Sequence, residues 1–309
     1  MENRGRSAGE QLRYIRKQDP EYPEKLSFYD RMPAGLYVKG NLPDPEKKTV
    51  AMVGARNCSS YGRTQALQFA EQLAREGVQI ISGLAYGIDA YSHQGALKGG
   101  GKTFAVLGCG ADICYPKENY LIYEEILKTG GGILSEYEPG TPPLGWHFPI
   151  RNRVISALAD LVLVVEARKK SGSLITVEYA LEQGKSIFAV PGRVGDSCSQ
   201  GCNSLIAQGA GIAWNPEVVL EELFGSWKER SGEAKQSGES FLLRFSEEER
   251  AVLRVLQTTE LSLERISAES HLELRTAATV LTMLSLEGVV YCPSPGYYCR
   301  SEDWPSEEL

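Results

Sequence analysis

Short apolar runs, Gly-rich turns and helical patterns alternate through the middle of the chain. The runs are uniformly apolar, which is typical of parallel strands buried on both faces. We expect strands at 49–54, 78–83, 103–108, 131–135, 160–165 and 186–192. Helical patterns over 62–76, 90–98, 120–128, 150–157, 174–183 and near 203–207 separate or follow them. The alternation predicts an α/β fold, a Rossmann-like, doubly wound and mostly parallel sheet whose loops gather at the carboxyl ends of the strands.

The flanking segments have a different composition. Residues 1–48 are a lead-in too short for its own core, expected to pack on the main domain at 49–224. Residues 225–242 are rich in Gly, Ser and charge, as linkers are, and 302–309 form a tail. Between them, 243–301 shows three helical patterns and a hairpin pattern with a turn at 293–296. This order predicts a small winged-helix domain.

The composition excludes several classes of protein. The chain has no apolar run of 18 residues, and its first residues lack the apolar core of a signal peptide, so we expect a cytoplasmic protein without membrane contact. Seven cysteines form neither a dense disulfide framework nor a set at zinc spacing. We therefore expect free thiols, no metal site and no cofactor.

The net charge of −7 is unevenly distributed. Residues 49–214 hold 14 basic and 14 acidic residues, whereas 215–309 hold 9 and 18. A neutral main domain is compatible with a local basic groove. An acidic C-terminal segment repels phosphates, so we expect the C-terminal domain to contact protein rather than DNA. The same repulsion argues against a winged-helix transcription factor.

Residues 148–176 contain a candidate anion site. Ser171, Gly172 and Ser173 form a turn before a helical pattern, and unpaired amides at a helix N-terminus suit a phosphate. Arg151 and Arg153 precede the strand at 160–165 and would add two guanidinium groups. The alternative is that these arginines pair with Glu136, Glu138 or Glu166, and that Gly172 serves only a positive φ.

Other candidates have equally open interpretations. Phe148 either stacks on a base or packs in the core. Ser82, Gly83 and Gly87 follow the second strand and would add a backbone anion contact. Asp89 and His93 lie four apart on one helix and are interpreted as a structural pair. Lys169 and Lys170 are interpreted as a solvated turn.

The sequence resembles the DprA/Smf family, the bacterial DNA-processing proteins of natural transformation. The matching runs are MVGARNCSSYG (52–62), ISGLAYGIDAYSHQGAL (81–97), AVLGCGADICYPKEN (105–119), LSEYEPG (134–140), FPIRNRVISAL (148–158), VVEARKKSGSLITVEYALEQGK (164–185) and FAVPGRVGDSCSQGCNSLIAQGA (188–210). They lie in order within residues 52–210, a span of about half of the chain. The short lead-in departs from members that carry a full helical domain before the core.

This resemblance implies single-stranded DNA binding, a homodimer and loading of the recombinase RecA, without established catalytic turnover. Arg56 and Lys117 match positions where the family uses basic DNA-contacting residues. Phe148, Arg151, Asn152 and Arg153 match its FPxRNR segment, and Ser171, Gly172 and Ser173 match its SGSLIT loop.

A competing hypothesis is an enzyme acting on a nucleotide or sugar phosphate. The SGSLITVE segment loosely resembles the loop of lysine-decarboxylase-like phosphoribohydrolases, with Glu178 as acid or base. The position of Glu178 inside a helix and the missing PGGxGT pattern count against it.

Overall fold

The computed structural model describes residues 12–225, 245–256, 260–286, 288–294 and 296–300. The chain divides into two units, residues 1–227 and 228–309, which are described separately. None of the described helices combines the length and apolar character needed to cross a membrane.

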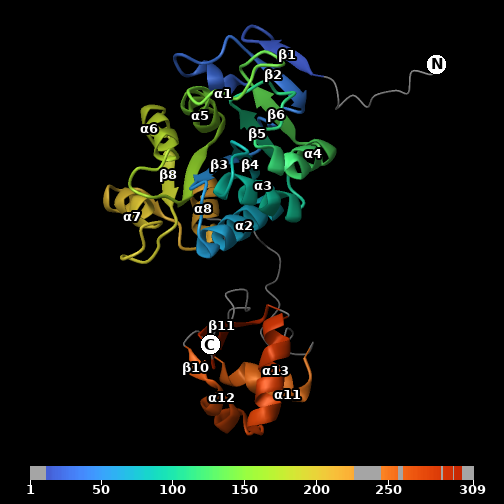
Figure 1. The fold of residues 1–309 in the computed structure, drawn as a ribbon, viewed down its shortest axis with the longest axis vertical. Helices are drawn as coiled ribbons and strands as arrows, with labels where there is room; N and C mark the ends of the chain where they lie inside the picture. Colours follow the sequence, from blue (N-terminus) through green and yellow to red (C-terminus); the bar gives the residue numbers. More distant parts are fainter. Residues whose placement is uncertain (1–11, 226–244, 257–259, 287, 295, 301–309) are drawn as a thin grey trace, which may run out of the picture. The chain divides into compact units, whose positions relative to one another are not determined.

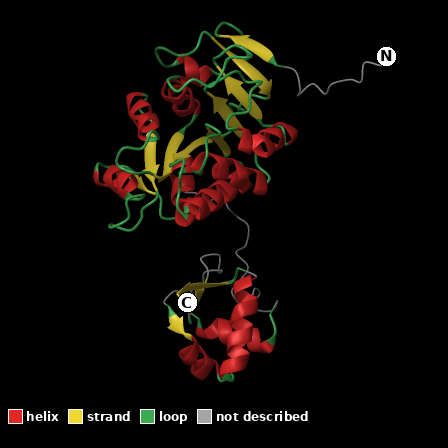
Figure 2. Ribbon diagram, viewed as in Figure 1, coloured by secondary structure: helices red, strands yellow, loops and turns green. Residues whose placement is uncertain are grey.

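The larger unit is built on one mixed sheet (Figure 2). Its strand order is β1-β2-β6-β5-β4-β3-β7-β8-β9. The strands are β1 (Arg13–Arg16), β2 (Gly35–Gly40), β3 (Thr49–Gly54), β4 (Gln79–Ser82), β5 (Thr103–Leu107), β6 (Gly132–Ser135), β7 (Leu161–Glu166), β8 (Ser186–Ala189) and β9 (Gly211–Ile212). From β6 to β9 neighbouring strands are parallel, which confirms the predicted α/β fold with a mostly parallel sheet.

The sheet extends beyond the six predicted strands at both edges. β2 pairs with β6, and β1 with β2, in antiparallel registers, so the lead-in adds two strands. Ile15, Leu36 and Val38 bury their side chains while their neighbours on β1 stay exposed, which fixes the face that these strands present to the core. β9 adds a short strand beside β8.

Helices cover both faces of this sheet (Figure 1). Apolar side chains of one face, such as Val53 and Val164, share a core with residues of α1, α5, α6 and α7. Those of the other face, such as Met52 and Leu163, pack with α2, α3 and α8, and α4 packs beside them. The helices are α1 (Glu24–Ser27), α2 (Ser60–Arg75), α3 (Ile88–Lys98), α4 (Tyr120–Lys128), α5 (His147–Leu158), α6 (Leu174–Glu182), α7 (Gln200–Ala207) and α8 (Pro216–Phe224).

The chain reverses direction across the sheet between β3 and β7. From β3 it proceeds through β4 and β5 to β6, and from β7 through β8 to β9 on the other side. The crossover helices from these two central strands therefore diverge and leave a crevice at their carboxyl ends. Open α/β sheets bind ligands at such a switch point.

The smaller unit has its own apolar core, formed by residues such as Leu253, Ile266 and Leu281. Its elements are α11 (Glu247–Val255), β10 (Leu261–Ser262), α12 (Leu263–Ser270), α13 (Leu274–Leu286), β11 (Val290–Ser294) and β12 (Tyr297–Arg300). Ser246 begins α11 with a reciprocal capping box to Glu249, as the sequence signature predicts. The strands form a three-stranded sheet in the order β10-β12-β11. The predicted linker at 225–242 and tail at 302–309 lie almost entirely outside the described residues.

Candidate nucleic-acid interface

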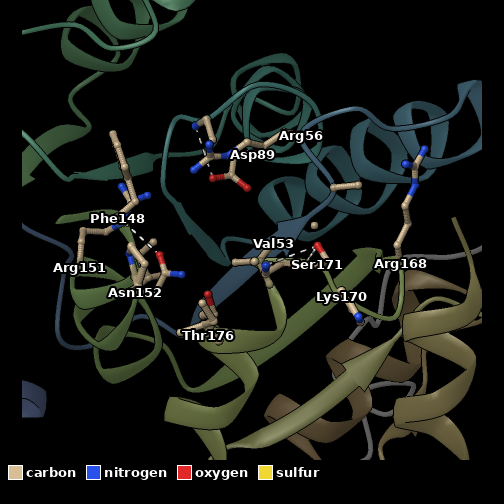
Figure 3. Close-up of a pocket in the computed structure, with 18 of the residues that line it drawn as sticks. Val53, Arg56, Asp89, Phe148, Arg151, Asn152, Arg168, Lys170, Ser171 and Thr176 are labelled. Carbon is tan, nitrogen blue, oxygen red and sulfur yellow. Dashed lines mark hydrogen bonds between the residues drawn. The ribbon is translucent and has the colours of Figure 1, made fainter. Parts of the chain in front are cut away.

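A pocket of about 430 Å³ lies at the switch point, above the ends of β3 and β7. In Figure 3, Arg56 and Asp89 lie on one side of it, Phe148, Arg151 and Asn152 on a second, and Ser171, Lys170 and Arg168 across from them. The lining residues are Val53, Gly54, Ala55, Arg56, Asn57, Ala85, Asp89, Phe148, Pro149, Arg151, Asn152, Ile155, Arg168, Lys170, Ser171, Gly172, Ser173, Ile175 and Thr176. Four separate loops or helix starts contribute to one hollow.

Three of its cationic side chains are exposed: Arg56, Arg168 and Lys170. Within the described residues, none of the three forms an ion pair. Arg168 contacts the thiol of Cys198 at 3.7 Å. Arg168 is not among the residues predicted from sequence, and Lys170 is predicted to lie in a solvated turn, because the run Arg168–Lys170 contains no signal of where the loop turns.

Gly87 determines the position of the Arg56 loop. It lies at φ +73°, and a Cβ there would be 2.3 Å from the carbonyl oxygen of Ala55 and 2.5 Å from that of Arg56. The next amide, that of Ile88, donates to the Ala55 carbonyl at 3.2 Å. Only glycine combines this φ with such close approach to the carbonyls of Ala55 and Arg56. Gly87 therefore allows the Arg56 loop to pack against the start of α3.

Arg151 lies beneath the pocket and is 4 % exposed. Its Nη1 donates to the carbonyl oxygens of Gly83, at 3.0 Å, and of Val106, and its Nε donates to the side-chain oxygen of Asn152 at 3.2 Å. Burial lowers the pKa of this guanidinium to about 10, opposed by the charge of Asp89. Arg151 is charged at neutral pH and ties together the ends of β4 and β5.

Asp89 faces Arg151 at the start of α3. Its carboxylate accepts hydrogen bonds from the amides of Gly83, at 3.1 Å, and Ala85, at 3.4 Å. Burial raises the pKa of this carboxyl, while Arg151 and the two amides oppose the rise. The amide of Gly83 thus serves an internal carboxylate, and the Ser82 hydroxyl donates to the Met52 carbonyl at 2.6 Å. Neither residue lines the pocket.

His93 does not form a dyad with Asp89. Its Nδ1 hydrogen-bonds to the Thr103 hydroxyl at 2.7 Å, and that hydroxyl donates to the Ile80 carbonyl at 2.9 Å. The Thr103 oxygen therefore accepts from Nδ1–H. Burial lowers the pKa of His93 to about 3, so the ring is neutral. These contacts are structural.

Phe148 is half-buried and belongs to α5, which begins at His147, three residues before the predicted start. Tyr115 stacks on its ring with centroids 5.6 Å apart, and the guanidinium carbons of Arg56 and Arg151 lie over the ring at 5.5 and 5.9 Å. Phe148 therefore both packs against its neighbours and lines the pocket.

The loop before α6 is more closed than the sequence suggests. The amides of Ser171, Leu174, Ile175 and Thr176 donate to carbonyls of residues 168, 171, 172 and 173, and the hydroxyls of Ser171 and Ser173 lie 2.7 Å apart. The prediction that unpaired amides form a phosphate cradle is wrong for these four groups. Gly172 is not at positive φ, and a Cβ there would meet nothing within 4 Å. The hydroxyls of Ser171 and Ser173 and the side chains of Arg168 and Lys170 are groups of this loop that a ligand can still contact.

Helix α2, which follows the first strand of the switch point, also has its N-terminus occupied. Glu166 is buried at the end of β7 and accepts from the Ser59 amide at 2.8 Å and from the Ser59 hydroxyl at 2.5 Å. The same hydroxyl accepts from the Gly62 amide at 3.1 Å. A Cβ at Gly62 would be 2.6 Å from the Glu166 carboxylate. An internal carboxylate thus stands where Rossmann-type sheets place a pyrophosphate.

Two further predicted residues lie outside the pocket lining. Arg153 forms a two-pronged ion pair with Glu136, at 2.9 and 2.6 Å, and donates to the Arg31 carbonyl at 2.8 Å. This pairing is the alternative that the sequence left open. Lys117 is exposed in a short 3-10 turn, Lys117–Asn119, in the β5–α4 loop. Six described cysteines, Cys58, Cys109, Cys114, Cys198, Cys202 and Cys299, are free thiols, and within the described residues no group of three or more His, Cys, Asp and Glu side chains is arranged to hold a metal ion.

Comparison with known proteins identifies the family. Residues 13–224 match the family model described as DNA recombination-mediator protein A. The chain belongs to this family. It is 45% identical over 204 residues to the DNA processing protein DprA of Streptococcus pneumoniae, a match that covers 66% of this chain and 72% of that protein. It is 44% identical to Protein Smf of Escherichia coli over 65% of this chain but only 54% of that protein.

Two solved structures of family members share the fold. DprA from Streptococcus pneumoniae superposes with a TM-score of 0.65 at 42% identity, covering 69% of this chain and 75% of that chain. DNA processing protein A from Helicobacter pylori, whose structure concerns its single-stranded DNA binding mode, gives a TM-score of 0.61 at 30% identity, covering 69% and 96%. The residues that match the family model, 13–224, fall within the larger unit.

Proposed function

We propose that this family member binds single-stranded DNA in the pocket at the β3–β7 switch point. The observation that carries the proposal is the convergence of Arg56, Arg168 and Lys170, all exposed and outside any ion pair in the described chain, beside the aromatic ring of Phe148. Cations that follow a backbone and an aromatic face beside them are what single-stranded nucleic acid requires. The Helicobacter pylori relative, described as binding single-stranded DNA, supports this assignment.

Binding is proposed to be independent of base sequence. The exposed pocket cations are suited to phosphates, which carry no sequence information. Of the contacts predicted from sequence, we retain Arg56, Asn152, Phe148, Ser171, Gly172 and Ser173 in the pocket and Lys117 on the approach to it. Arg151, Arg153, Ser82 and Gly83 are proposed to act by holding the surrounding structure, since their polar groups engage other parts of the protein.

The family description as a recombination mediator supports a role in handing the bound strand to a recombinase. We propose RecA as this partner, with the protein protecting incoming DNA during natural transformation. A homodimer would place two pockets on one particle and raise the avidity for a long strand. We place this activity in the cytoplasm, without catalytic turnover.

The smaller unit is proposed to be a winged-helix domain that contacts protein. Three helices followed by the β11–β12 hairpin, with β10 pairing to β12, support the first part. The helix α13, which would enter a DNA groove, carries Arg275 as its one basic residue. A helix with so little positive charge is poorly suited to neutralise phosphates.

A phosphoribohydrolase-like enzyme is the alternative function. Glu178, its proposed acid or base, is exposed on α6 and does not line the pocket. Asp89, the acidic residue that does line it, accepts hydrogen bonds from two amides and faces the charge of Arg151. These positions favour binding over catalysis.

The deciding experiment is a titration with oligo-dT of graded length against mononucleotides at fixed salt. We expect the affinity for oligo-dT to rise with its length over several nucleotides. We expect dTMP to bind weakly and not to be converted into a product. Oligo-dA and oligo-dC of equal length control for sequence preference. Release of base or phosphate from a mononucleotide, or no gain with length, would overturn the proposal.

A further inference from the structure

Aromatic side chains continue from the pocket onto the surface of the β5–α4 loop. Phe148 lies in the pocket wall, Tyr115 stacks on it at an interplanar angle of 29°, and Tyr86 lies on the adjoining β4–α3 loop. Tyr115 and Tyr86 are 41% and 44% exposed. Large aromatic residues exposed beside a cationic pocket are candidates for contact with bases.

The ring of Phe148 is already used within the protein. Tyr115 stacks on it, two guanidinium groups lie over it, and its edge is so close to the backbone of Gly108 that a Cβ there would be 2.8 Å away. These neighbours limit the part of the Phe148 ring that a base can reach from the pocket. The Tyr115 side chain remains 41% exposed, and its stacking on Phe148 holds the Tyr115 ring in place.

The loop that carries Tyr115 is fixed before any ligand binds. The side-chain amide of Asn119 is buried and donates to the carbonyls of Leu84 and Ala85 at 2.9 and 3.2 Å, and the Tyr86 hydroxyl donates to Glu118 at 2.6 Å. Ala85 itself lines the pocket. The two loops are thus joined at the pocket rim, so that Tyr115 needs little reordering to receive a ligand.

A cationic residue follows Tyr115 closely along the same loop. Lys117, two residues after Tyr115, is exposed and outside the pocket lining. An aromatic face followed by a flexible cation repeats, outside the pocket, the combination of ring and cation found within it. The surface therefore offers a second position whose aromatic ring and cation suit the base and the phosphate of a nucleotide.

We propose that Tyr115 is the base-stacking residue for the nucleotide next to the pocket, with Lys117 holding its phosphate. The strand then leaves the pocket across the β5–α4 loop. This inference rests on the proposed single-stranded DNA binding and adds to it the direction of the strand and the residue that meets a base.

The test compares oligo-dT with an abasic oligonucleotide of equal length on the full chain. Tyr115→Leu is expected to weaken oligo-dT binding about 10-fold, or ~1.4 kcal/mol, while abasic binding changes little. Tyr115→Phe is expected to bind like the unaltered protein. Lys117→Ala should weaken both ligands by a similar factor, because it contacts phosphate.

Phe28→Ala is the matched control, since Phe28 is 67% exposed beside α1 and outside the pocket lining. Circular dichroism and thermal unfolding establish that each variant is folded, and Tyr115→Trp provides a second aromatic variant expected to retain binding. Equal oligo-dT affinity of Tyr115→Leu and Tyr115→Phe would overturn the inference alone. If the unaltered protein bound no oligonucleotide, the proposed function itself would fail.

Discussion

The Glu166 carboxylate accepts hydrogen bonds from both the amide and the hydroxyl of Ser59, the residue that caps α2. Removing the carboxylate leaves the partly buried amide and hydroxyl of Ser59 without their acceptor. We expect Glu166→Ala to lower the free energy of unfolding by about 2–4 kcal/mol, measured by urea denaturation. Glu178→Gln, an exposed change on the next helix, should leave it within about 0.5 kcal/mol. A similar value for both variants would contradict the assigned role of Glu166.

Substitution of Arg151 is expected to lower the stability of the protein more than it directly lowers the affinity for DNA. Arg151→Met leaves Asp89 buried without its cation and should lower the free energy of unfolding by about 3 kcal/mol or more. Combining it with Asp89→Asn should restore part of this loss, because the uncompensated charge is gone. Urea denaturation of the two single variants and the double variant measures this coupling. Strict additivity would show that the two residues act independently.

The exposed cations should instead affect the salt dependence of binding. Arg56→Ala, Arg168→Ala and Lys170→Ala are each expected to leave stability unchanged and to reduce the slope of log affinity against log salt by about 0.7. Fluorescence anisotropy with oligo-dT at several salt concentrations measures the slope. Arg153→Met is the control: its partner is Glu136, so its cost should be in stability. An unchanged slope in all three alanine variants would remove these side chains from the interface.

Gly87→Ala should impair binding without touching a cation. A side chain at φ +73° would meet the carbonyls of Ala55 and Arg56, which forces the Arg56 loop away from Phe148. We expect lower stability and weaker oligo-dT binding together. Gly77→Ala, also at positive φ but with nothing within 4 Å of its Cβ, separates backbone strain from displacement of the loop. It should lose stability and keep its affinity.

His93 should make stability depend on pH. Its pKa is about 3 in the folded chain against an ordinary 6.5, so below pH 6.5 the unfolded chain binds a proton that the folded chain does not. Stability therefore falls as pH decreases, by about 2 kcal/mol between pH 7 and pH 5 from this group. Urea denaturation of His93→Gln at both values should show a correspondingly smaller difference. An equal difference would contradict the buried neutral ring.

The pattern of apolar runs predicts the six central parallel strands, because most of their residues are buried on both faces of the sheet. The same reasoning placed Arg56, Phe148 and Ser171 together, since carboxyl ends of parallel strands meet at one edge. It also left open the ion pair that Arg153 makes with Glu136. The order of strands was less accessible: β1 and β2 join the sheet by antiparallel pairing, which local pattern does not specify.

What sequence could not provide was the use of each polar group. Ser82 ends β4 and Gly83 follows it, where ligand-binding residues often lie. The Ser82 hydroxyl nevertheless donates to the Met52 carbonyl, and the Gly83 amide donates to the Asp89 carboxylate. The amides before α6 are used within their own turns, which follows from local backbone geometry. Arg168 belongs to a charged run of ordinary composition, and its place in the pocket depends on where the chain turns after β7.

The hold of Arg151 on the carbonyls of Gly83 and Val106 has a kinetic consequence. Because these main-chain carbonyls of two neighbouring strands are held by one side chain, the base of the pocket does not widen to accept a base-paired, double-stranded ligand. An oligonucleotide that forms a hairpin must therefore break its base pairs before it enters the pocket. We expect the association rate of hairpin-forming oligonucleotides to be limited by hairpin melting. The association rate of an unstructured homopolymer should be limited by diffusional encounter alone.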